Sequence, residues 1–155
     1  MKETARWLTP EEQHAWRSFV RLHERLGGRL SRLLQAQSKL SAADFAVLVN
    51  LTDVPEGRQR YQDLCRDLEW EKSRMSHHIA RMAGRGLVVR EEAPDDARGA
   101  FVVITPAGRE AIEAAAPRHV EAVRELFLDH VTPAELRMLG EISSRVVAKL
   151  DEDPA

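Results

Sequence analysis

One stretch of the sequence, residues 64–105, restricts the possible folds more than any other. It opens with a short helical pattern over 64–68, and a longer helical pattern follows over 72–85. Two apolar runs, 87–90 and 101–104, then predict a pair of β-strands. Two helices followed by a hairpin form the pattern of a winged helix-turn-helix.

The second of these helical patterns has two chemically different faces. Met75, Ile79 and Met82 fall at positions i, i+4 and i+7, so they share one face, which we expect to be buried. The opposite face carries hydroxyl, imidazole and guanidinium groups and no acid: Ser73, Arg74, Ser76, His77, Arg81 and Arg85. Such a helix fits the major groove of DNA, where arginine pairs with guanine and serine or histidine reaches base edges or phosphates.

The local charge also favours a nucleic-acid partner. Between residues 69 and 90 there are five lysines and arginines against two glutamates, whereas the whole chain has a net charge of −2. A locally positive face on a weakly acidic chain is the electrostatic footprint of a DNA-binding element. Arg98, in the turn between the two predicted strands, is placed to reach a minor groove, whose negative potential attracts guanidinium.

Three sequence features carry a resemblance to a known family: the run from Ser73 to Met82, Asp96-Ala97-Arg98-Gly99 between the strands, and Ile104-Thr105-Pro106-Ala107-Gly108 after them. Over nearly all of its 155 residues the chain resembles the MarR (multiple-antibiotic-resistance regulator) family of transcription factors. The resemblance implies a mainly α fold with a small β-wing, in which a winged helix-turn-helix is flanked by N- and C-terminal dimerisation helices.

Two residues depart from the family pattern. Glu69 stands where many such turns use glycine, and Asp95 stands where many relatives carry a second wing arginine. The second departure removes at most one phosphate or minor-groove contact.

The polar residues of the predicted reading region receive individual roles. Arg74, His77 and Arg81 are expected to read base edges. The other expected DNA contacts go to phosphates, base edges or the minor groove: Lys72, Ser73, Ser76, Arg90, Asp96 and Arg98. The resemblance assigns Asp96 to orienting the Arg98 guanidinium. The alternative is a merely solvated charged face with an ordinary hairpin-tip arginine.

Long helices are expected on both sides of the winged helix-turn-helix, which spans about 41–105. The flanking segments, about 9–37 and 106–150, carry more apolar positions than a winged helix-turn-helix of roughly 60 residues can cover. We therefore expect residues 1–155 to form one domain that pairs as a homodimer, with two reading helices one duplex turn apart. A kink or a break is expected at Pro117.

An effector pocket is a further expectation. Trp16, Phe19, His23 and Phe45 place aromatic rings and an imidazole on otherwise apolar helical faces. The resemblance implies that these residues line the space between the terminal helices and the winged helix-turn-helix, where many relatives bind small aromatic or phenolic effectors. Residues at helical spacing also serve as ordinary core, and this alternative stays open.

Redox and metal chemistry have weaker support in the sequence. Cys65 lies between Leu64 and Leu68 and is expected to be a small buried core residue rather than a redox sensor. No two of the six histidines stand at the i, i+4 spacing of a helical metal pair. We therefore expect neither a metal site nor a cofactor.

The rest of the sequence excludes several classes of protein. No apolar run approaches the ~18 residues of a membrane span, and no signal peptide opens the chain, so we expect a cytoplasmic protein without a membrane partner. Without a phosphate loop or a nucleophile motif, an enzyme is not expected. The sequence predicts a homodimeric regulator, more a repressor than an activator, that binds a palindromic double-stranded site and is released by a small effector. The alternatives are a winged-helix protein-interaction module and a ligand-insensitive architectural DNA binder.

Overall fold

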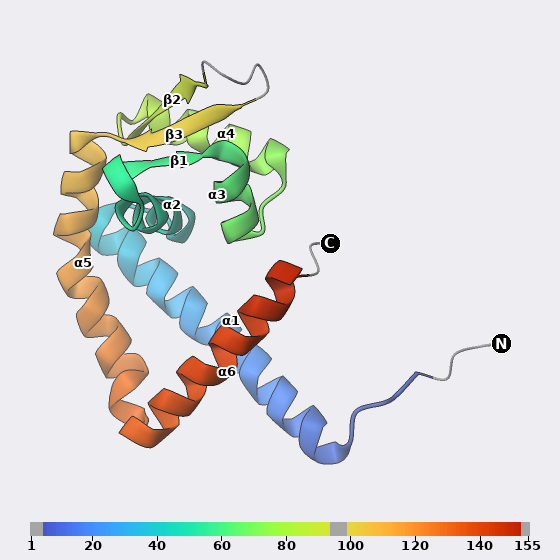
Figure 1. Cartoon of the computed structure of the whole chain (residues 1–155). Coiled ribbons are helices and arrows are strands. Elements are labelled where there is room, and N and C mark those ends of the chain that lie inside the picture. Colours follow the sequence, from blue (N-terminus) through green and yellow to red (C-terminus); the bar gives the residue numbers. More distant parts are fainter. Residues whose placement is uncertain (1–4, 94–98, 153–155) are drawn as a thin grey trace. The chain divides into compact units, whose positions relative to one another are not determined.

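A computed structural model describes residues 5–93 and 99–152 of the chain and confirms a mainly helical fold with a three-stranded sheet (Figure 1). The helices are α1 (Pro10–Ser38), α2 (Ala42–Thr52), α3 (Tyr61–Leu68), α4 (Lys72–Gly84), α5 (Pro106–Leu126) and α6 (Pro133–Glu152). The strands are β1 (Arg58–Arg60), β2 (Val88–Glu92) and β3 (Ala100–Ile104), and the short 3-10 helices are η1 (Pro55–Gly57) and η2 (Leu128–His130). The chain forms two compact units, residues 1–117 and 118–155.

Side-chain caps fix the starts of the first two helices. Thr9 Oγ1 accepts a hydrogen bond from the N–H of Glu12 at 3.1 Å, and the Glu12 carboxylate accepts one from the N–H of Thr9 at 2.9 Å. Ser41 and Asp44 form the same reciprocal pair at the start of α2, at 3.0 and 2.9 Å. Each box satisfies two N–H groups that a helix start would otherwise leave unpaired, so these sequences begin helices here.

The three strands form one antiparallel sheet in the order β1-β3-β2. Val88 pairs with Ile104 across β2 and β3, and Arg58 pairs with Val103 across β1 and β3. Burial alternates along β3, where Val102 and Ile104 face the core. The tip of the β2–β3 hairpin lies outside the described residues.

The core of the first unit lies between this sheet and helices α2, α3 and α4. The predicted buried face of α4 is confirmed, because Met75, Ile79 and Met82 are all at most 2% exposed. They pack in one cluster with side chains of α2, α3 and the sheet, among them Leu48, Leu51, Leu64, Val88 and Val102. Burying this face leaves the opposite face of α4 on the surface.

The Thr-x-x-Gly sequence after β3 has a structural explanation. The hydroxyl of Thr105 donates to the carbonyl oxygen of Gly86 at 2.6 Å and accepts from the N–H of Gly108 at 3.0 Å. A Cβ at residue 108 would collide with the carbonyl oxygen of Leu87. Only glycine fits there, so the start of α5 is held against the turn that follows α4.

Of the kink or break expected at Pro117, the break is absent, because α5 continues through this residue. Proline has no N–H to donate to the carbonyl four residues earlier, that of Glu113. Since Glu113 is exposed, water can solvate that carbonyl, which lowers the cost of the missing hydrogen bond. Pro117 nevertheless marks the boundary between the two compact units.

Candidate nucleic-acid interface

Helix α4 presents the polar face that the sequence predicts. Its buried residues are Met75, His78, Ile79 and Met82. Every expected DNA contact on this helix is exposed: Lys72, Ser73, Arg74, Ser76, His77 and Arg81. Because α4 contains no acidic residue, nothing on the helix itself opposes the approach of a polyanion.

The turn between α3 and α4 depends on a residue in an unfavourable backbone conformation. Glu69 has a φ of 52° and a ψ of 40°, in the left-handed region that glycine enters most readily. Its N–H donates to the carbonyl of Arg66 at 3.1 Å, so the conformation closes α3. This is the position at which the sequence departs from the glycine of many similar turns.

Arg74 is held on an aromatic ring. The guanidinium carbon lies 4.2 Å from the centroid of the Trp70 ring, within the range of a cation–π contact. Trp70 itself is half-buried and packs against the core. The stacking restricts the rotamers of Arg74 while its N–H groups remain at the surface.

Behind this face lies a buried carboxylate, Asp44, at the start of α2. It is 3% exposed, and its oxygens lie 2.9 Å from His78 Nε2 and 2.7 Å from Arg85 Nη1. Burial alone would raise the pKa of this carboxyl, but the N–H of Ser41, the Arg85 guanidinium and His78 together lower the pKa below its ordinary value. Asp44 is therefore ionised at neutral pH and links α2 to α4.

His78 continues this chain of contacts towards the exposed face. Its Nδ1 lies 3.3 Å from Arg81 Nη2, and its ring meets that of Trp70 edge to face, with centroids 5.3 Å apart. Burial lowers the pKa of the imidazole, and this effect and the nearby Arg81 outweigh the opposing effect of Asp44. His78 is 8% exposed, so it is packed rather than available to DNA.

Arg85 is exposed, as the helical pattern predicts, but its guanidinium is already paired. The helix ends at Gly84, and the Arg85 guanidinium turns back to pair with Asp44 and to donate to the carbonyl of Lys39 at 2.9 Å. The physical reason is the buried Asp44 carboxylate, which needs a cation. Periodicity cannot reveal a partner that lies 41 residues away.

A small cationic hollow lies where α3, α4 and the wing meet. Its volume is about 140 Å³, and it is lined by Arg60, Tyr61, Gln62, Lys72, Arg90, Gly99 and Ala100. The Tyr61 hydroxyl donates to the carbonyl of Lys72 at 2.7 Å, and the Arg90 guanidinium lies 5.4 Å from the centroid of the Tyr61 ring. Burial raises the pKa of the Tyr61 phenol, so this ring stays neutral between the cations.

The hollow adds two residues that the sequence did not suggest as contacts, Arg60 and Gln62. It brings three cations together and no acid, next to the first turn of α3, whose N–H groups favour anions. A DNA phosphate has the matching charge. The two wing residues expected to contact DNA, Asp96 and Arg98, lie outside the described residues.

The proposed effector residues lie on two different helices. On α1, the Trp16 and Phe19 ring centroids are 5.8 Å apart, and those of Phe19 and His23 are 6.4 Å apart. Trp16 and Phe19 are 58% and 53% exposed, whereas Phe45 on α2 packs against the core. Trp16, Phe19 and His23 therefore form one exposed aromatic stripe along α1, which Phe45 does not join.

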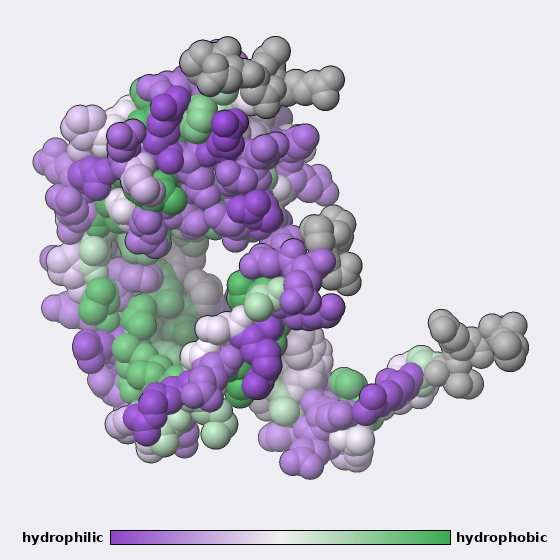
Figure 2. Space-filling view, in the orientation of Figure 1, coloured by the Kyte–Doolittle hydropathy of each residue, from purple (hydrophilic) through white to green (hydrophobic). Residues whose placement is uncertain are grey.

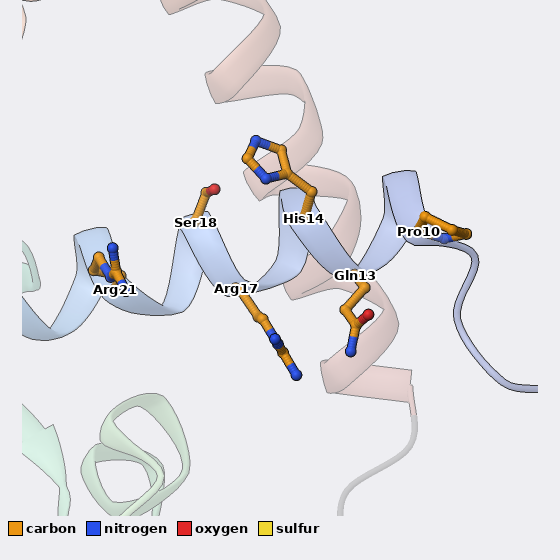
Figure 3. A pocket seen from close by; sticks show the side chains of 6 residues that line it. All are labelled: Pro10, Gln13, His14, Arg17, Ser18 and Arg21. Atoms are coloured by element: carbon orange, nitrogen blue, oxygen red, sulfur yellow. The ribbon is translucent and has the colours of Figure 1, made fainter.

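A separate hollow of about 360 Å³ follows the polar side of α1. It is lined by Pro10, Gln13, His14, Arg17, Ser18 and Arg21. Figure 3 shows these side chains leaving the helix in different directions, with His14 and Ser18 on one side and Gln13 and Arg17 on the other. A surface of this kind does not enclose a ligand.

The thiol and the histidines form no reactive centre in the described part of the chain. Cys65 is buried in α3, as expected, and burial raises the pKa of its thiol. Among residues 5–93 and 99–152, no three histidine, cysteine or acidic side chains gather in a way that suits a metal ion. Over the same residues, no helix is long and apolar enough to cross a bilayer.

Apolar side chains remain uncovered on the terminal helices. Figure 2 shows hydrophobic surface along α5, while the surface over the sheet and α3 is mostly hydrophilic. Helix α6 contains no buried residue, and its large exposed apolar side chains are Leu136, Met138, Leu139, Ile142, Val146, Val147 and Leu150. On α1, Trp16, Phe19 and Leu22 are exposed as well.

Known proteins share this arrangement. A family model for the winged helix DNA-binding domain matches residues 40–108, and no curated protein sequence matches the chain. The chain is similar to AbsC, a MarR family transcriptional regulator from Streptomyces coelicolor, with 36% identity and a TM-score of 0.87, covering 96% of this chain and 100% of AbsC.

A second MarR family regulator from Streptomyces coelicolor, Sco3205, was solved in complex with DNA. The chain is 38% identical to it, with a TM-score of 0.88, and the match covers 99% of this chain and 95% of Sco3205. The organohalide-sensing regulator RdhR-CbdbA1625, solved with 2,4-dichlorophenol bound, shares the fold at 16% identity and a TM-score of 0.72, covering 99% of this chain and 88% of that one.

Proposed function

Because the chain belongs to the MarR family of DNA-binding transcriptional regulators, we propose that it represses transcription as a homodimer on a palindromic operator. The single observation that carries this proposal is the acid-free, exposed polar face of α4 over a buried apolar face. The protein is not an enzyme. We place its action in the cytoplasm, where the chromosome lies.

The reading residues of the proposal are Arg74, His77 and Arg81. All three are exposed on α4, and Arg74 and Arg81 are held by contacts to Trp70 and His78. Guanidinium groups fixed in this way lose less entropy when they form a bidentate pair with guanine. Ser73 and Ser76 would supply shorter contacts to base edges or phosphates.

Phosphate binding in the proposal falls to the cationic hollow and the wing. Lys72, Arg90 and Arg60 converge beside the first turn of α3 and provide charge without base preference. We retain Arg98 as a minor-groove or phosphate contact, with Asp96 orienting it. Such contacts supply affinity, while the α4 side chains supply sequence discrimination.

The homodimer is supported by the uncovered apolar side chains of α1 and α6. A monomer of this size rarely exposes so many large apolar residues along whole helices. Pairing two copies about a two-fold axis covers the same surface on each copy and presents two α4 helices to successive major grooves. The operator would therefore carry two inverted half-sites.

Release by a small aromatic or phenolic effector is the remaining part of the proposal. It is supported by the stacked Trp16, Phe19 and His23 rings on α1 and by the dichlorophenol bound to a regulator of the same fold. In a dimer this exposed stripe becomes part of an enclosed surface. A thermal-shift screen of phenols and aromatic acids tests it, and the absence of any stabilising compound counts against it.

The decisive experiment is the selection of bound sites from random duplexes. A two-fold symmetric consensus with half-sites one helical turn apart supports the proposal. The alternatives give other results. A protein-interaction module selects no sequence, and an architectural binder retains duplexes without a consensus and is not released by any compound.

A further inference from the structure

His78 is a buried imidazole on the helix that is proposed to read DNA, and direct DNA contact does not explain it. It is 8% exposed, and three side chains surround its ring: Asp44, Arg81 and Trp70. A buried polar side chain in a helix interface is unfavourable unless its polar atoms are used. The contacts of His78 show what they are used for.

The neighbours of the two ring nitrogens define the tautomer. Nε2 lies 2.9 Å from a carboxylate oxygen of Asp44, in an ion-pair contact that is not aligned as a hydrogen bond. Because the carboxylate can only accept, the proton is placed best on Nε2. Nδ1 lies 3.3 Å from Arg81 Nη2, which can only donate, so Nδ1 must offer its lone pair. The neutral imidazole accepts from Arg81 and keeps its N–H on the side of Asp44, whereas an imidazolium would direct an N–H at the guanidinium of Arg81.

This arrangement constrains two arginines of the reading face. Arg81 gives one N–H to His78 and keeps its other N–H groups for a base or a phosphate. Arg74 stacks on Trp70, whose ring meets the edge of the His78 ring. The buried histidine is thus in contact with one reading arginine directly and with the other through a single ring.

We propose that His78 is a positioning residue for base reading: fixed by Asp44, it holds Arg81 through Nδ1 and supports the Trp70 ring on which Arg74 stacks. The inference rests on the proposed function, since it assumes that Arg81 contacts bases. It extends that function by assigning part of the sequence discrimination to a residue that never touches DNA. It also connects the start of α2 with the reading face.

The charged groups around His78 determine how the arrangement responds to pH. Asp44 on α2 favours the imidazolium, while burial and the guanidinium groups of Arg81 and Arg74 on α4 oppose it. Arg85, just after α4, neutralises the same carboxylate and donates to the Lys39 carbonyl after α1. The opposing effects dominate, so the pKa of His78 is lowered and the acceptor at Nδ1 is present at neutral pH.

The test compares two isosteres of histidine in a double-mutant cycle. His78→Gln keeps a donor that can reach Asp44 and removes the acceptor at Nδ1, while His78→Asn keeps an acceptor close to Nδ1. The measured quantity is the ratio of affinities for the selected duplex and for a duplex with scrambled half-sites. His78→Gln is expected to lower this ratio about fivefold to tenfold in the wild-type chain and by a clearly smaller factor in Arg81→Ala, where only the contact through Trp70 to Arg74 remains.

The outcomes separate the positioning role from the proposed function. Arg81→Ala that discriminates as well as the wild type overturns the positioning role, because Arg81 then reads nothing, whereas the proposed function is overturned by a selection that yields no two-fold symmetric consensus. If Arg81→Ala loses discrimination, the effect of His78→Gln decides. The positioning role alone is overturned if His78→Gln lowers the ratio by the same factor in the wild-type and Arg81→Ala backgrounds, or lowers it in neither. A merely structural role would weaken both duplexes equally and leave the ratio unchanged.

A pH profile decides the question if His78→Gln fails to fold. We use a His77→Asn background, so that His78 carries the one imidazole left on α4. Protonation of His78 replaces the acceptor by a donor, so the discrimination ratio is expected to fall only as the pH is lowered below about 6.5, the ordinary pKa of an imidazole, because the pKa of His78 is lowered by burial. His78→Asn in this background should show a flat profile; a fall as steep as in its parent overturns the inference.

Discussion

Arg74 is the single side chain whose environment most clearly suits base reading. It is exposed, carries no ion pair among those found in the described residues, and rests on the Trp70 ring. Arg74→Ala is expected to reduce specific affinity by about 1–3 kcal/mol without changing the unfolding temperature. Competition binding with specific and scrambled duplexes measures this loss.

The matched control is Arg118→Ala, which removes an exposed arginine from the second compact unit. Arg118→Ala should change the affinity for neither the specific nor the scrambled duplex by more than the experimental error. If Arg74→Ala binds the selected duplex as tightly as the wild type, α4 does not read DNA through this residue.

Glu69 offers a test of backbone strain in the turn before the reading helix. Its φ of 52° is unfavourable for a residue with a Cβ and suits glycine. Glu69→Gly is expected to raise the free energy of unfolding by about 0.5–1 kcal/mol, after the greater freedom of glycine in the unfolded chain is subtracted. Glu69→Ala keeps the strain and should not stabilise the protein. Chemical denaturation of the wild type and the two variants measures the free energies of unfolding. Equal stabilities of Glu69→Gly and Glu69→Ala would contradict the explanation.

The lowered pKa of His78 predicts how stability depends on pH. The unfolded chain binds a proton at the ordinary pKa of about 6.5, whereas the folded chain resists protonation. Stability is therefore complete above that pH and falls as the pH decreases towards the folded pKa. The lowered pKa of Asp44 adds a second loss at more acidic pH.

Urea denaturation at pH 7.5 and 5.5 checks the sign. The difference between the two free energies of unfolding should be smaller in His78→Asn than in the wild type. His119, whose pKa burial also lowers, contributes in the same direction, so His119→Asn is the matched comparison. An unchanged difference in His78→Asn would mean that His78 is not the titrating group.

The residues that sequence reasoning identified best are those whose roles depend on local spacing. Met75, Ile79 and Met82 share a face because of helical geometry, and they are buried. The exposure of Arg85 follows from the same spacing, but its pairing with Asp44 does not, because the two residues are distant in the sequence. Arg60 showed no signal at all, since its place beside Lys72 and Arg90 follows from strand pairing.

At the scale of elements, the cationic hollow couples the wing to α3 and α4. Arg90 lies over the Tyr61 ring, and Tyr61 in turn donates to the backbone of Lys72. The helix starts were predictable because Thr-Pro and Ser-x-x-Asp sequences cap locally. The continuity of α5 through Pro117 could not be predicted from the sequence, because it depends on whether water can reach the freed carbonyl of Glu113.

Removing a phosphate contact in this region should change the salt dependence of binding. Arg90→Ala is expected to weaken specific and scrambled duplexes equally and to reduce the slope of log affinity against log salt by about 0.9. We expect the same of Arg98→Ala in the wing. Titrations between 50 and 300 mM salt, with Arg118→Ala as the control, measure the slope; an unaltered slope removes the residue from the set of phosphate contacts.

At the scale of the whole molecule, association through the terminal helices is the central expectation. The apolar residues of α6 include Leu139, Ile142 and Val146, at the spacing of one helical face, and all are exposed. Ile142→Glu places a charge in the proposed interface, and we expect monomers at micromolar concentration and loss of operator binding. Ser144→Glu adds the same charge on the other side of the helix and should remain dimeric.

Analytical ultracentrifugation of both variants provides the measurement. A wild-type chain that sediments as a monomer at micromolar concentration would remove the basis for a palindromic operator. An Ile142→Glu variant that stays dimeric would place the interface elsewhere.

The burial of Cys65 has a practical consequence for measuring the assembly. It is the one cysteine of the sequence and lies inside α3, so alkylating reagents react slowly with the native chain. Ala83→Cys, at an exposed position of α4 outside the expected DNA contacts, would carry a nitroxide or a fluorophore without any need to replace the native thiol. Electron–electron resonance between two such labels would then report the spacing of the paired α4 helices with and without DNA.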